Sequence, residues 1–288
     1  MDIKFHCDEK SNFRRPNQNV SAFLYTNYSI ELHSHDFYEV NIIINGTGIH
    51  QIEKNFISVK QGDVFIISPM SKHAYHNTEN LDVYHILFKK SFIKASFSKA
   101  SKTPGFLQFM EIEPFLREHN TNLNFLHLSP TQLIELESDL KIIEETSVFN
   151  KECWGSLRKH TAWKILYYFS YLFHEQLSNS TSLLLHKHSK LIVDTLTYIH
   201  ENFAEKLTIE LLAKRVFLSR STFLRSFQAI CNCSPIIYIN DYRIKKAIDL
   251  LETTTLSKSD IAFSCGFSDA SHMQKHLKKR LYADSKFN

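Results

Sequence analysis

The sequence is poor in residues that break, loosen or cross-link a chain. Six glycines and six prolines in 288 residues are too few for a collagen-like or linker-rich protein. The five cysteines, at positions 7, 153, 231, 233 and 265, are odd in number and scattered, which excludes a disulfide framework and indicates reduced thiols. No apolar run approaches the ~18–20 residues of a membrane span, and the first residues lack the apolar stretch of a secretory signal. We therefore expect no membrane segment and a cytoplasmic location.

What the sequence does contain is typical of a folded protein with one basic part. Its 43% hydrophobic and 22% charged residues are enough for about two domains. Residues 189–288 hold 15 Lys/Arg against 10 Asp/Glu, a balance of +5, whereas residues 1–188 hold 19 against 20, a balance of −1. A basic final third is what binding to a polyanion needs, because Lys and Arg displace counterions from phosphates.

The first part of the chain has the pattern of β structure. Short runs of Val, Ile, Phe and Tyr extend from residue 20 to about residue 97, and they are interrupted at Asn45-Gly46 and Gly62-Asp63. Strands at this spacing with no helical period between them predict a small antiparallel barrel or jelly roll. Residues 98–130 show no clear hydrophobic period, and they are expected to connect the β-rich part to the helical part that follows.

From residue 131 to residue 185 the period becomes helical. Leu133, Leu136, Leu140 and Ile143 recur at steps of three and four residues. A second helical run, over residues 157–177, carries more apolar surface than one buried stripe requires. This surplus is compatible with packing on the barrel and also with self-association, so we expect a homodimer.

The final hundred residues contain an internal repeat. Leu212-Ala213, Leu218-Ser219, Phe223 and Phe227 recur 49 or 50 residues later as Ile261-Ala262, Phe267-Ser268, Met273 and Leu277. In each copy a short helix with a small Ala precedes a tight turn and a second helix with apolar residues four apart, which is the pattern of a helix-turn-helix. Helix starts are indicated at Thr208, Ser219, Ser234-Pro235, Ser257 and Ser268.

One long helix is predicted to join the two copies. Residues 235–252 are expected to form it, with Ile237, Ile244, Ile248 and Leu251 on its inner side. At 1.5 Å per residue it would be about 27 Å long. That length suits two reading helices placed in successive major-groove faces, roughly 34 Å apart on one side of a duplex.

Residues 190–288 resemble the AraC/XylS family of bacterial transcription regulators. The resemblance rests on the two repeats together with Arg225, Ser234-Pro235, Tyr238, Arg243, Ala247, Leu251, Gly266-Phe267-Ser268-Asp269 and Ser271. It implies an all-α domain with two helix-turn-helix units, with promoter DNA and RNA polymerase as partners and activation or repression of transcription as the outcome. The DNA-reading positions that it implies are Arg220, Ser221, Leu224 and Arg225 in the first unit and Ala270, Ser271, Gln274 and Lys275 in the second.

The side chains at these positions suit direct readout of bases. Arg225 can donate two hydrogen bonds to a guanine edge, and Gln274 can pair with adenine. Leu224 and Ala270 can contact a thymine methyl group.

The β-rich part resembles the two cupin motifs. His33-Ser34-His35, Glu39 and Gly46 match the first motif, and Gly62, Pro69, His73 and Asn77 match the second. On a strand, His33 and His35 point to the same side because the side-chain period is two. With Glu39 and His73 they make a three-His, one-carboxylate set suited to Zn, Fe, Mn, Ni or Cu.

Three interpretations of this set stay open. It can line a pocket for an organic effector, hold a divalent transition metal, or consist of satisfied polar groups inside the barrel. The stretch from His35 to Glu39 resembles sugar-responsive regulators, which implies a carbohydrate effector contacted by His33, His35, Tyr38, Glu39 and His73. A metal-sensing regulator is the alternative. A cupin enzyme is a distant third, because no catalytic triad or phosphate loop accompanies the motif, and we expect no enzyme activity.

The sequence thus predicts an α+β protein of two domains. Residues 1–130 are expected to form the cupin-like sensor and residues 131–188 a helical dimerisation and linker region. Residues 189–288 are expected to form the DNA-binding domain.

Overall fold

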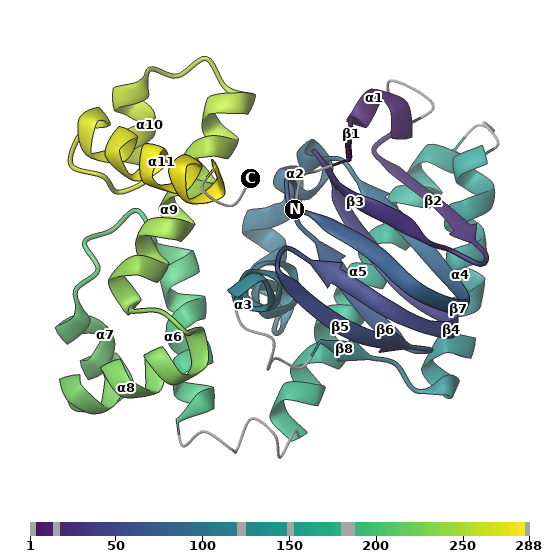
Figure 1. Ribbon diagram of the computed structural model, residues 1–288, viewed down its shortest axis with the longest axis horizontal. Helices are drawn as coiled ribbons and strands as arrows, with labels where there is room; N and C mark the ends of the chain where they lie inside the picture. Colours follow the sequence, from purple (N-terminus) through teal and green to yellow (C-terminus); the bar gives the residue numbers. More distant parts are fainter. Residues whose placement is uncertain (1–3, 14–17, 120–124, 149–152, 180–187, 286–288) are drawn as a thin grey trace. The chain divides into compact units, whose positions relative to one another are not determined.

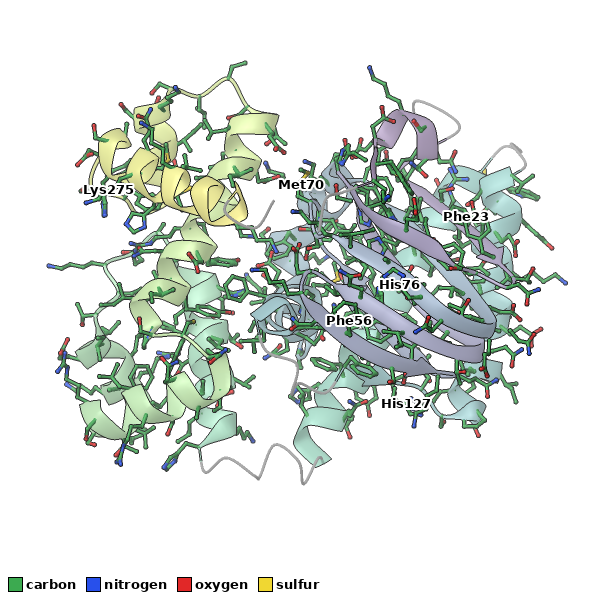
Figure 2. The ribbon with its side chains drawn as sticks, viewed as in Figure 1. Phe23, Phe56, Met70, His76, His127 and Lys275 are labelled. Carbon is green, nitrogen blue, oxygen red and sulfur yellow. The ribbon has the colours of Figure 1, made fainter. Side chains whose placement is uncertain are left out.

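The computed structural model describes residues 4–13, 18–119, 125–148, 153–179 and 188–285. They form two compact units, one over Asp2–Asn179 and one over Ser180–Asn288 (Figure 1). Figure 2 draws the side chains of both units, including the exposed Phe56 and Met70 of the first and Lys275 of the second.

The first unit combines a sheet with helices. Its strands are β1 (Phe5–Cys7), β2 (Val20–Tyr25), β3 (Ile30–His35), β4 (Tyr38–Ile52), β5 (Asn55–Lys60), β6 (Asp63–Ile67), β7 (His73–Phe88) and β8 (Leu126–His127). Its helices are α1 (Glu9–Asn12), α2 (Lys90–Ala100), the π-helix η1 (Gln108–Ile112), α3 (Glu113–His119), α4 (Pro130–Val148) and α5 (Trp154–Asn179).

The strands form one eight-stranded sheet that does not close. Its order is β1-β3-β7-β4-β6-β8, with β2 added on β7 and β5 on β4. The pairs are antiparallel except β1–β3, which is parallel. The sheet-rich, mainly antiparallel domain predicted from the sequence is confirmed, although its sheet is not closed: the long strands β4 and β7 pair with different neighbours at their two ends, and the edges of the sheet do not join.

Side-chain alternation gives the sheet two buried faces. On β4, Val40 and Ile42 lie in the core shared with the helices, whereas Ile43 lies in a second core on the opposite face. Glu39 and Asn41 have the parity of Ile43, so they belong to that inner face. The inner face is where the predicted sensor residues gather.

The helical segment expected at residues 131–188 is not a separate body. Leu136, Leu140 and Ile143 of α4 and Phe169 of α5 share one core with strands β2, β4, β6 and β7, and both helices lie behind the sheet in Figure 1. The boundary expected after residue 130 is therefore absent, because the apolar stripes of α4 and α5 cover the outer face of the sheet. Residues 180–187, assigned to the linker, lie outside the described residues.

The second unit is helical, as predicted. It consists of α6 (Ser189–Asn202), α7 (Ile209–Arg215), α8 (Arg220–Cys231), α9 (Pro235–Thr253), α10 (Lys258–Ser264) and α11 (Ala270–Ser285). The side chains of Thr208, Ser219, Ser234 and Ser257 accept a hydrogen bond from the third residue of the helix that each begins, which confirms four expected starts. At α11 the cap is Asp269 rather than Ser268, since its Oδ1 accepts from the His272 N–H at 2.7 Å.

Helix α9 is continuous, but its buried side differs from the expected one. Ile244 is buried, as predicted, whereas Ile237 and Leu251 are 49% and 38% exposed. The remaining buried side chains of α9 are those of Pro235, Tyr238, Ile239, Tyr242 and Ala247. Ile248 packs against the core of the second helix-turn-helix, as predicted. No helix in the described part of the chain is long and apolar enough to cross a membrane.

Candidate effector pocket and nucleic-acid interface

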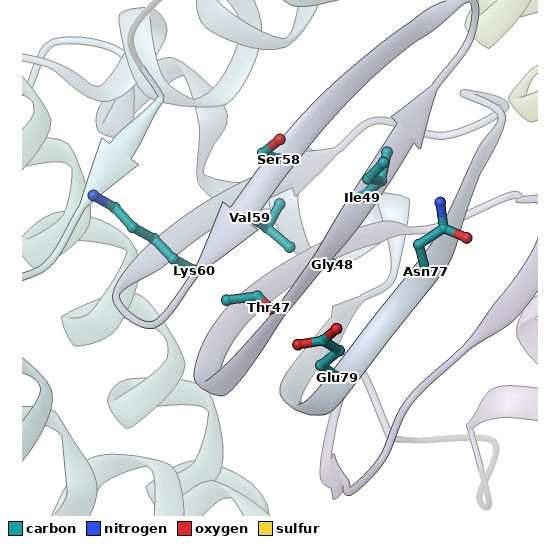
Figure 3. A pocket seen from close by; sticks show the side chains of 8 residues that line it. All are labelled: Thr47, Gly48, Ile49, Ser58, Val59, Lys60, Asn77 and Glu79. Carbon is teal, nitrogen blue, oxygen red and sulfur yellow. The ribbon is translucent and has the colours of Figure 1, made fainter.

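A shallow hollow lies across β4, β5 and β7 (Figure 3). It is lined by residues of all three strands, namely Thr47, Gly48, Ile49, Ser58, Val59, Lys60, Asn77 and Glu79. None of the predicted sensor residues lines it.

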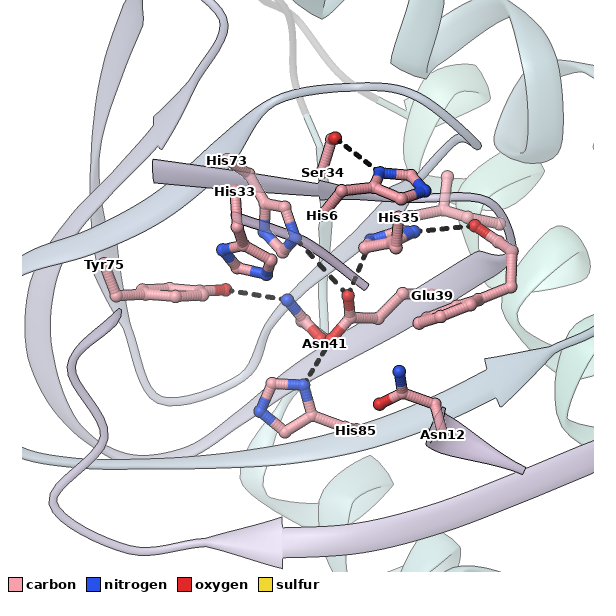
Figure 4. A network of polar contacts seen from close by, with 12 residues as sticks. His6, Asn12, His33, Ser34, His35, Glu39, Asn41, His73, Tyr75 and His85 are labelled. Carbon is pink, nitrogen blue, oxygen red and sulfur yellow. Dashed lines mark hydrogen bonds and ion pairs between the residues drawn. The ribbon is translucent and has the colours of Figure 1, made fainter. Parts of the chain in front are cut away.

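The predicted sensor residues meet on the inner face of the sheet (Figure 4). His33 comes from β3, Glu39 from β4 and His73 from β7, and one ligand-capable atom from each lies within 4.8 Å of the other two. All three side chains are buried. Among the described residues this is the one group of three or more His, Cys, Asp or Glu side chains with metal-ligand spacing.

Glu39 is the centre of the cluster. Its Oε2 lies 2.8 Å from His35 Nε2 and 3.4 Å from His73 Nε2, and its Oε1 contacts Nδ1 of His85. His35 is thus held against Glu39, although it lies outside the set of three whose atoms are all within 4.8 Å. The three imidazoles come from β3 and from both ends of β7, so the curl of the sheet assembles the site.

Burial and hydrogen bonding set the charges in the cluster. Burial alone would raise the pKa of Glu39, but hydrogen bonds from His35, His73 and His85 outweigh it and hold that pKa well below its usual range. Burial lowers the pKa of His73 to about 3 and also lowers the pKa of His33. The site at neutral pH therefore presents the Glu39 carboxylate beside the neutral imidazoles of His33 and His73, the protonation states in which these groups bind metal ions.

Several polar atoms of the inner face have no hydrogen-bond partner among the described residues. They are both ring nitrogens of His50, Nδ1 of His73, Nε2 of His85 and Oδ1 of Asn41. Buried polar atoms are normally paired, so such a group calls for an explanation, of which a bound ion, water or ligand is the simplest.

The sequence analysis missed His50, Asn41 and His85. His85 lies twelve residues after His73 on β7, and the register of this strand shifts between them, so the period-two rule alone does not place it in the cluster. Tyr38 was predicted to contact the effector, but it packs against the core on the helix-covered face of the sheet, because it has the parity of Val40 and not of Glu39. The structure therefore does not bring Tyr38 to the cluster.

Aromatic rings surround one side of the cluster. Phe23, Tyr25 and Tyr28 each lie within 5.4 Å of the His85 ring, centroid to centroid. Tyr25 and Tyr28 stack on each other at 5.2 Å, and Tyr25 is 49% exposed. These rings extend from the buried cluster to the surface of the unit.

The first helix-turn-helix unit consists of α7 and α8. Phe223 and Phe227 are fully buried, with their ring centroids 5.7 Å apart, and they fix the inner side of α8. The predicted reading residues face outward: Arg220, Ser221 and Arg225 are exposed and Leu224 is half-buried. Arg220 makes a surface ion pair with Glu210 at 3.0 Å, a contact weak enough to be exchanged for a phosphate.

The second unit, formed by α10 and α11, repeats this arrangement. Met273 is fully buried at the place where the first unit has Phe223. Ser271, Gln274 and Lys275 are exposed, and Ala270 is half-buried. Ala270 packs against the core of this unit, so its reading face consists of the three exposed side chains.

Two family models match separate parts of the chain. An AraC-like ligand binding domain matches residues 17–139, and a helix-turn-helix domain matches residues 212–282. The first match covers strands β2 to β8 and the start of α4, and the second covers most of both helix-turn-helix units.

Several known proteins are similar to this chain, either over most of its length or over the second unit alone. YdeC of Bacillus subtilis, an uncharacterized HTH-type transcriptional regulator, is 26% identical over 89% of this chain and 82% of its own length. RhaS of Escherichia fergusonii, an HTH-type transcriptional activator, is 27% identical over 83% of this chain and 80% of its own length. Among solved structures, ToxT from Vibrio cholerae is 14% identical, with 90% of this chain and 94% of that chain covered and a TM-score of 0.39. The DNA-binding domain of AdpA, solved with a target DNA, is 29% identical, with 31% and 81% covered and a TM-score of 0.31.

Proposed function

The chain belongs to the AraC/XylS family of transcription regulators, with an AraC-like ligand-binding domain ahead of a DNA-binding domain, and from this premise we propose how it works. Its two helix-turn-helix units dock side by side on promoter DNA, under the control of a ligand held on the inner face of the sheet. The observation that carries the proposal is the continuous helix α9 between two units whose reading faces are exposed.

Each unit has a distinct task in DNA recognition. Arg225 reads a guanine and Gln274 an adenine, while the small or apolar Leu224 and Ala270 lie against thymine methyl groups. Arg220, Ser221, Ser271 and Lys275 complete the two reading faces. With 19 residues, α9 is about 28 Å long, which suits units placed one helical turn apart on the duplex.

The effector site is proposed to hold a divalent transition metal. His33, His35, Glu39 and His73 supply the imidazole and carboxylate donors that Zn, Fe, Mn, Ni or Cu accept. The neutral imidazoles and the unpartnered nitrogens of His50, His73 and His85 support this assignment. A bound cation would offset the charge of the Glu39 carboxylate and hold β3, β4 and β7 together.

A carbohydrate is the second candidate effector. The aromatic surface of Phe23, Tyr25 and Tyr28 favours it, because flat rings pack well against the apolar faces of sugars and Tyr25 reaches the solvent. A sugar that touched Glu39 would have to displace side chains that are at most 4% exposed at present, among them His33 and His73. The compactness of the cluster is the reason for placing the metal first.

We further propose that the protein acts in the cytoplasm as a homodimer that contacts RNA polymerase. Exposed apolar residues on α4 and α5 support self-association: Ile134 is 71%, Tyr171 56% and Leu157 45% exposed. The effector changes transcription by binding one arrangement of sensor and DNA-binding unit more tightly than the other.

One experiment tests the sensing part of this proposal. The purified full chain is analysed by elemental analysis and native mass spectrometry, and its promoter binding is measured before and after a chelator. About one metal per chain, with DNA binding altered by the chelator and restored by one metal, is the expected result. If the protein contained no metal and its DNA binding responded only to a sugar, the effector would be the carbohydrate and not a metal.

A further inference from the structure

Arg243 lies where three elements of the DNA-binding unit meet. It is on α9, and its guanidinium reaches the end of α6 by two hydrogen bonds. Nε donates to the Phe203 carbonyl and Nη2 to the Glu205 carbonyl, both at 2.7 Å. The side chain is half-buried, so these charge-assisted bonds are only partly screened by water.

The third element is the turn of the second helix-turn-helix. Gly266 in this turn has a φ of +76°, and a Cβ placed on it would lie 2.7 Å from the Ala204 carbonyl oxygen and 2.9 Å from Nη2 of Arg243. The turn therefore touches both the end of α6 and the guanidinium. We call the set of Phe203–Glu205, Arg243 and Gly266 the clamp.

The clamp lies between the two helix-turn-helix units. The first unit packs on the amino-terminal half of α9, where Phe227 contacts Tyr238 with ring centroids 5.7 Å apart. The second unit packs on the carboxy-terminal half of α9, in the core that contains Ile244 and Ala247.

Helix α6 contacts both units. Arg215 of α7 lies over the ring of Tyr198 on α6, with Cζ 3.9 Å from the centroid, and Phe203 at the end of α6 packs against the second core. The clamp at the end of α6 is therefore a second connection between the units in addition to α9.

We propose that Arg243 is a positioning residue that sets the second helix-turn-helix against the first, and with it the spacing at which the protein reads two half-sites. Helix α9 alone fixes the separation along its axis, whereas the clamp fixes the orientation of the second unit about that axis. This inference rests on the two-unit DNA docking proposed above. Arg243 itself contacts no DNA in this scheme.

The energetic consequence follows from the linkage of two binding modules. When both modules fit their half-sites together, the second binds at a high effective concentration and affinity gains of roughly 10²–10⁴ result. The gain falls if the second module has a range of orientations. Loss of the clamp should therefore reduce binding to bipartite DNA and leave binding to a single half-site unchanged.

Two substitutions of Arg243 are tested, so that the proposal can still be checked if one variant fails to fold. Arg243→Lys keeps the charge but loses the planar pair of donors, and Arg243→Gln also loses the charge. Lys245→Gln, two residues along the same helix, is the matched control for charge. The DNA is a bipartite site selected from a random library by the wild-type full chain, together with versions in which either half is scrambled.

The readout is the ratio of affinities for bipartite DNA and for DNA with the second half scrambled. The expected result is a ratio lowered about tenfold in Arg243→Lys and at least as much in Arg243→Gln, with half-site affinity within twofold of wild type. Lys245→Gln should keep the wild-type ratio. Hydrogen exchange should show faster exchange in α10 and α11 than in wild type, and unchanged exchange in α7 and α8.

Two results would overturn the proposal. A wild-type ratio in both Arg243 variants would show that α9 alone positions the units. Parallel loss of bipartite and half-site binding would show that Arg243 only stabilises the end of α6. If scrambling the second half had no effect on the wild-type chain, the two-unit docking would itself be wrong, a failure distinct from the other two.

Discussion

His50 illustrates how burial sets the charge of single residues inside the sensor. Its ring is fully buried and stacks on Tyr75, with centroids 4.1 Å apart and planes 8° from parallel. Burial, and then the neighbouring His73, lower its pKa well below the ordinary value of 6.5. The folded protein therefore keeps His50 neutral at pH values where the unfolded chain protonates it.

A dependence of stability on pH follows from this difference. Above pH 6.5 His50 is neutral in both states, and as the pH falls below 6.5 the unfolded state gains a proton that the folded state lacks, so the free energy of unfolding falls. The contribution of His50 between pH 7 and pH 5.5 is about 1 kcal/mol. We expect the free energy of unfolding of His50→Phe, which keeps a stacked ring, to fall less between pH 7 and pH 5.5 than that of wild type. Chemical denaturation of chelator-treated protein at the two pH values measures this difference. Identical slopes in the variant and wild type would contradict the assignment.

Phe217 has a backbone conformation that lowers the stability of the fold. It lies in the turn of the first helix-turn-helix with a φ of +55° and is 94% exposed, so no packing offsets the left-handed backbone. The second unit has Gly266 at the corresponding place. We expect Phe217→Gly to raise the free energy of unfolding by roughly 0.5–1 kcal/mol.

Phe263→Gly is the matched control for that substitution. Phe263 is 82% exposed but lies inside helix α10, where Gly costs about 1 kcal/mol. The two substitutions should therefore change the thermal midpoint in opposite directions. A lower midpoint for Phe217→Gly would show that its ring contributes to the fold.

At the scale of elements, the reading helix α8 carries the sharpest prediction. Arg225 is exposed on the side of α8 opposite the buried Phe223 and Phe227. We expect Arg225→Ala to weaken promoter binding by about 1–3 kcal/mol and to relax the preference for one base pair. Gln228→Ala, which removes an exposed polar side chain one turn further along α8, is the control and should leave base preference unchanged. An unaltered footprint and base preference in Arg225→Ala would remove this residue from the reading face.

The helices could be predicted from sequence because their signals are local. Caps at Thr208, Ser219, Ser234 and Ser257 and the apolar steps of each hairpin depend only on neighbouring residues. The prediction of the buried side of α9 was partly wrong. Tyr238 and Tyr242 are buried there because they contact Phe227 on α8 and His200 on α6. Which of several apolar residues faces inward depends on the partner helix, and the sequence of α9 does not contain that partner.

The sensor site could be predicted only in part, as could the buried side of α9. The spacing of His33, His35 and Glu39 is local, and the resemblance added His73. His85 and His50 join the cluster only because β7 bends and pairs with both β3 and β4, which is a property of the assembled sheet. Strand spacing predicted a sheet-rich, mainly antiparallel domain, whereas closure depends on pairing between distant edges and does not occur in this sheet.

At the scale of the whole molecule, sensing and DNA binding reside in different compact units. The cluster lies in the unit of Asp2–Asn179, and both helix-turn-helix units lie in Ser180–Asn288. We therefore expect His33→Ala with His35→Ala to abolish the effector or metal response of transcription, while promoter affinity stays within twofold of that of chelator-treated wild type and no longer changes with metal. Reporter assays and binding assays on the same variant measure the two effects. Normal induction in the double variant would show that the effector binds elsewhere.

The central claim is that two helix-turn-helix units joined by α9 bind one promoter together. Hydroxyl-radical footprinting of the full chain on its selected DNA tests this most directly. The account predicts two protected segments per protein chain, one helical turn or about 10 base pairs apart on the same side of the duplex. A single protected segment per chain, or two segments on opposite sides of the duplex, would contradict it.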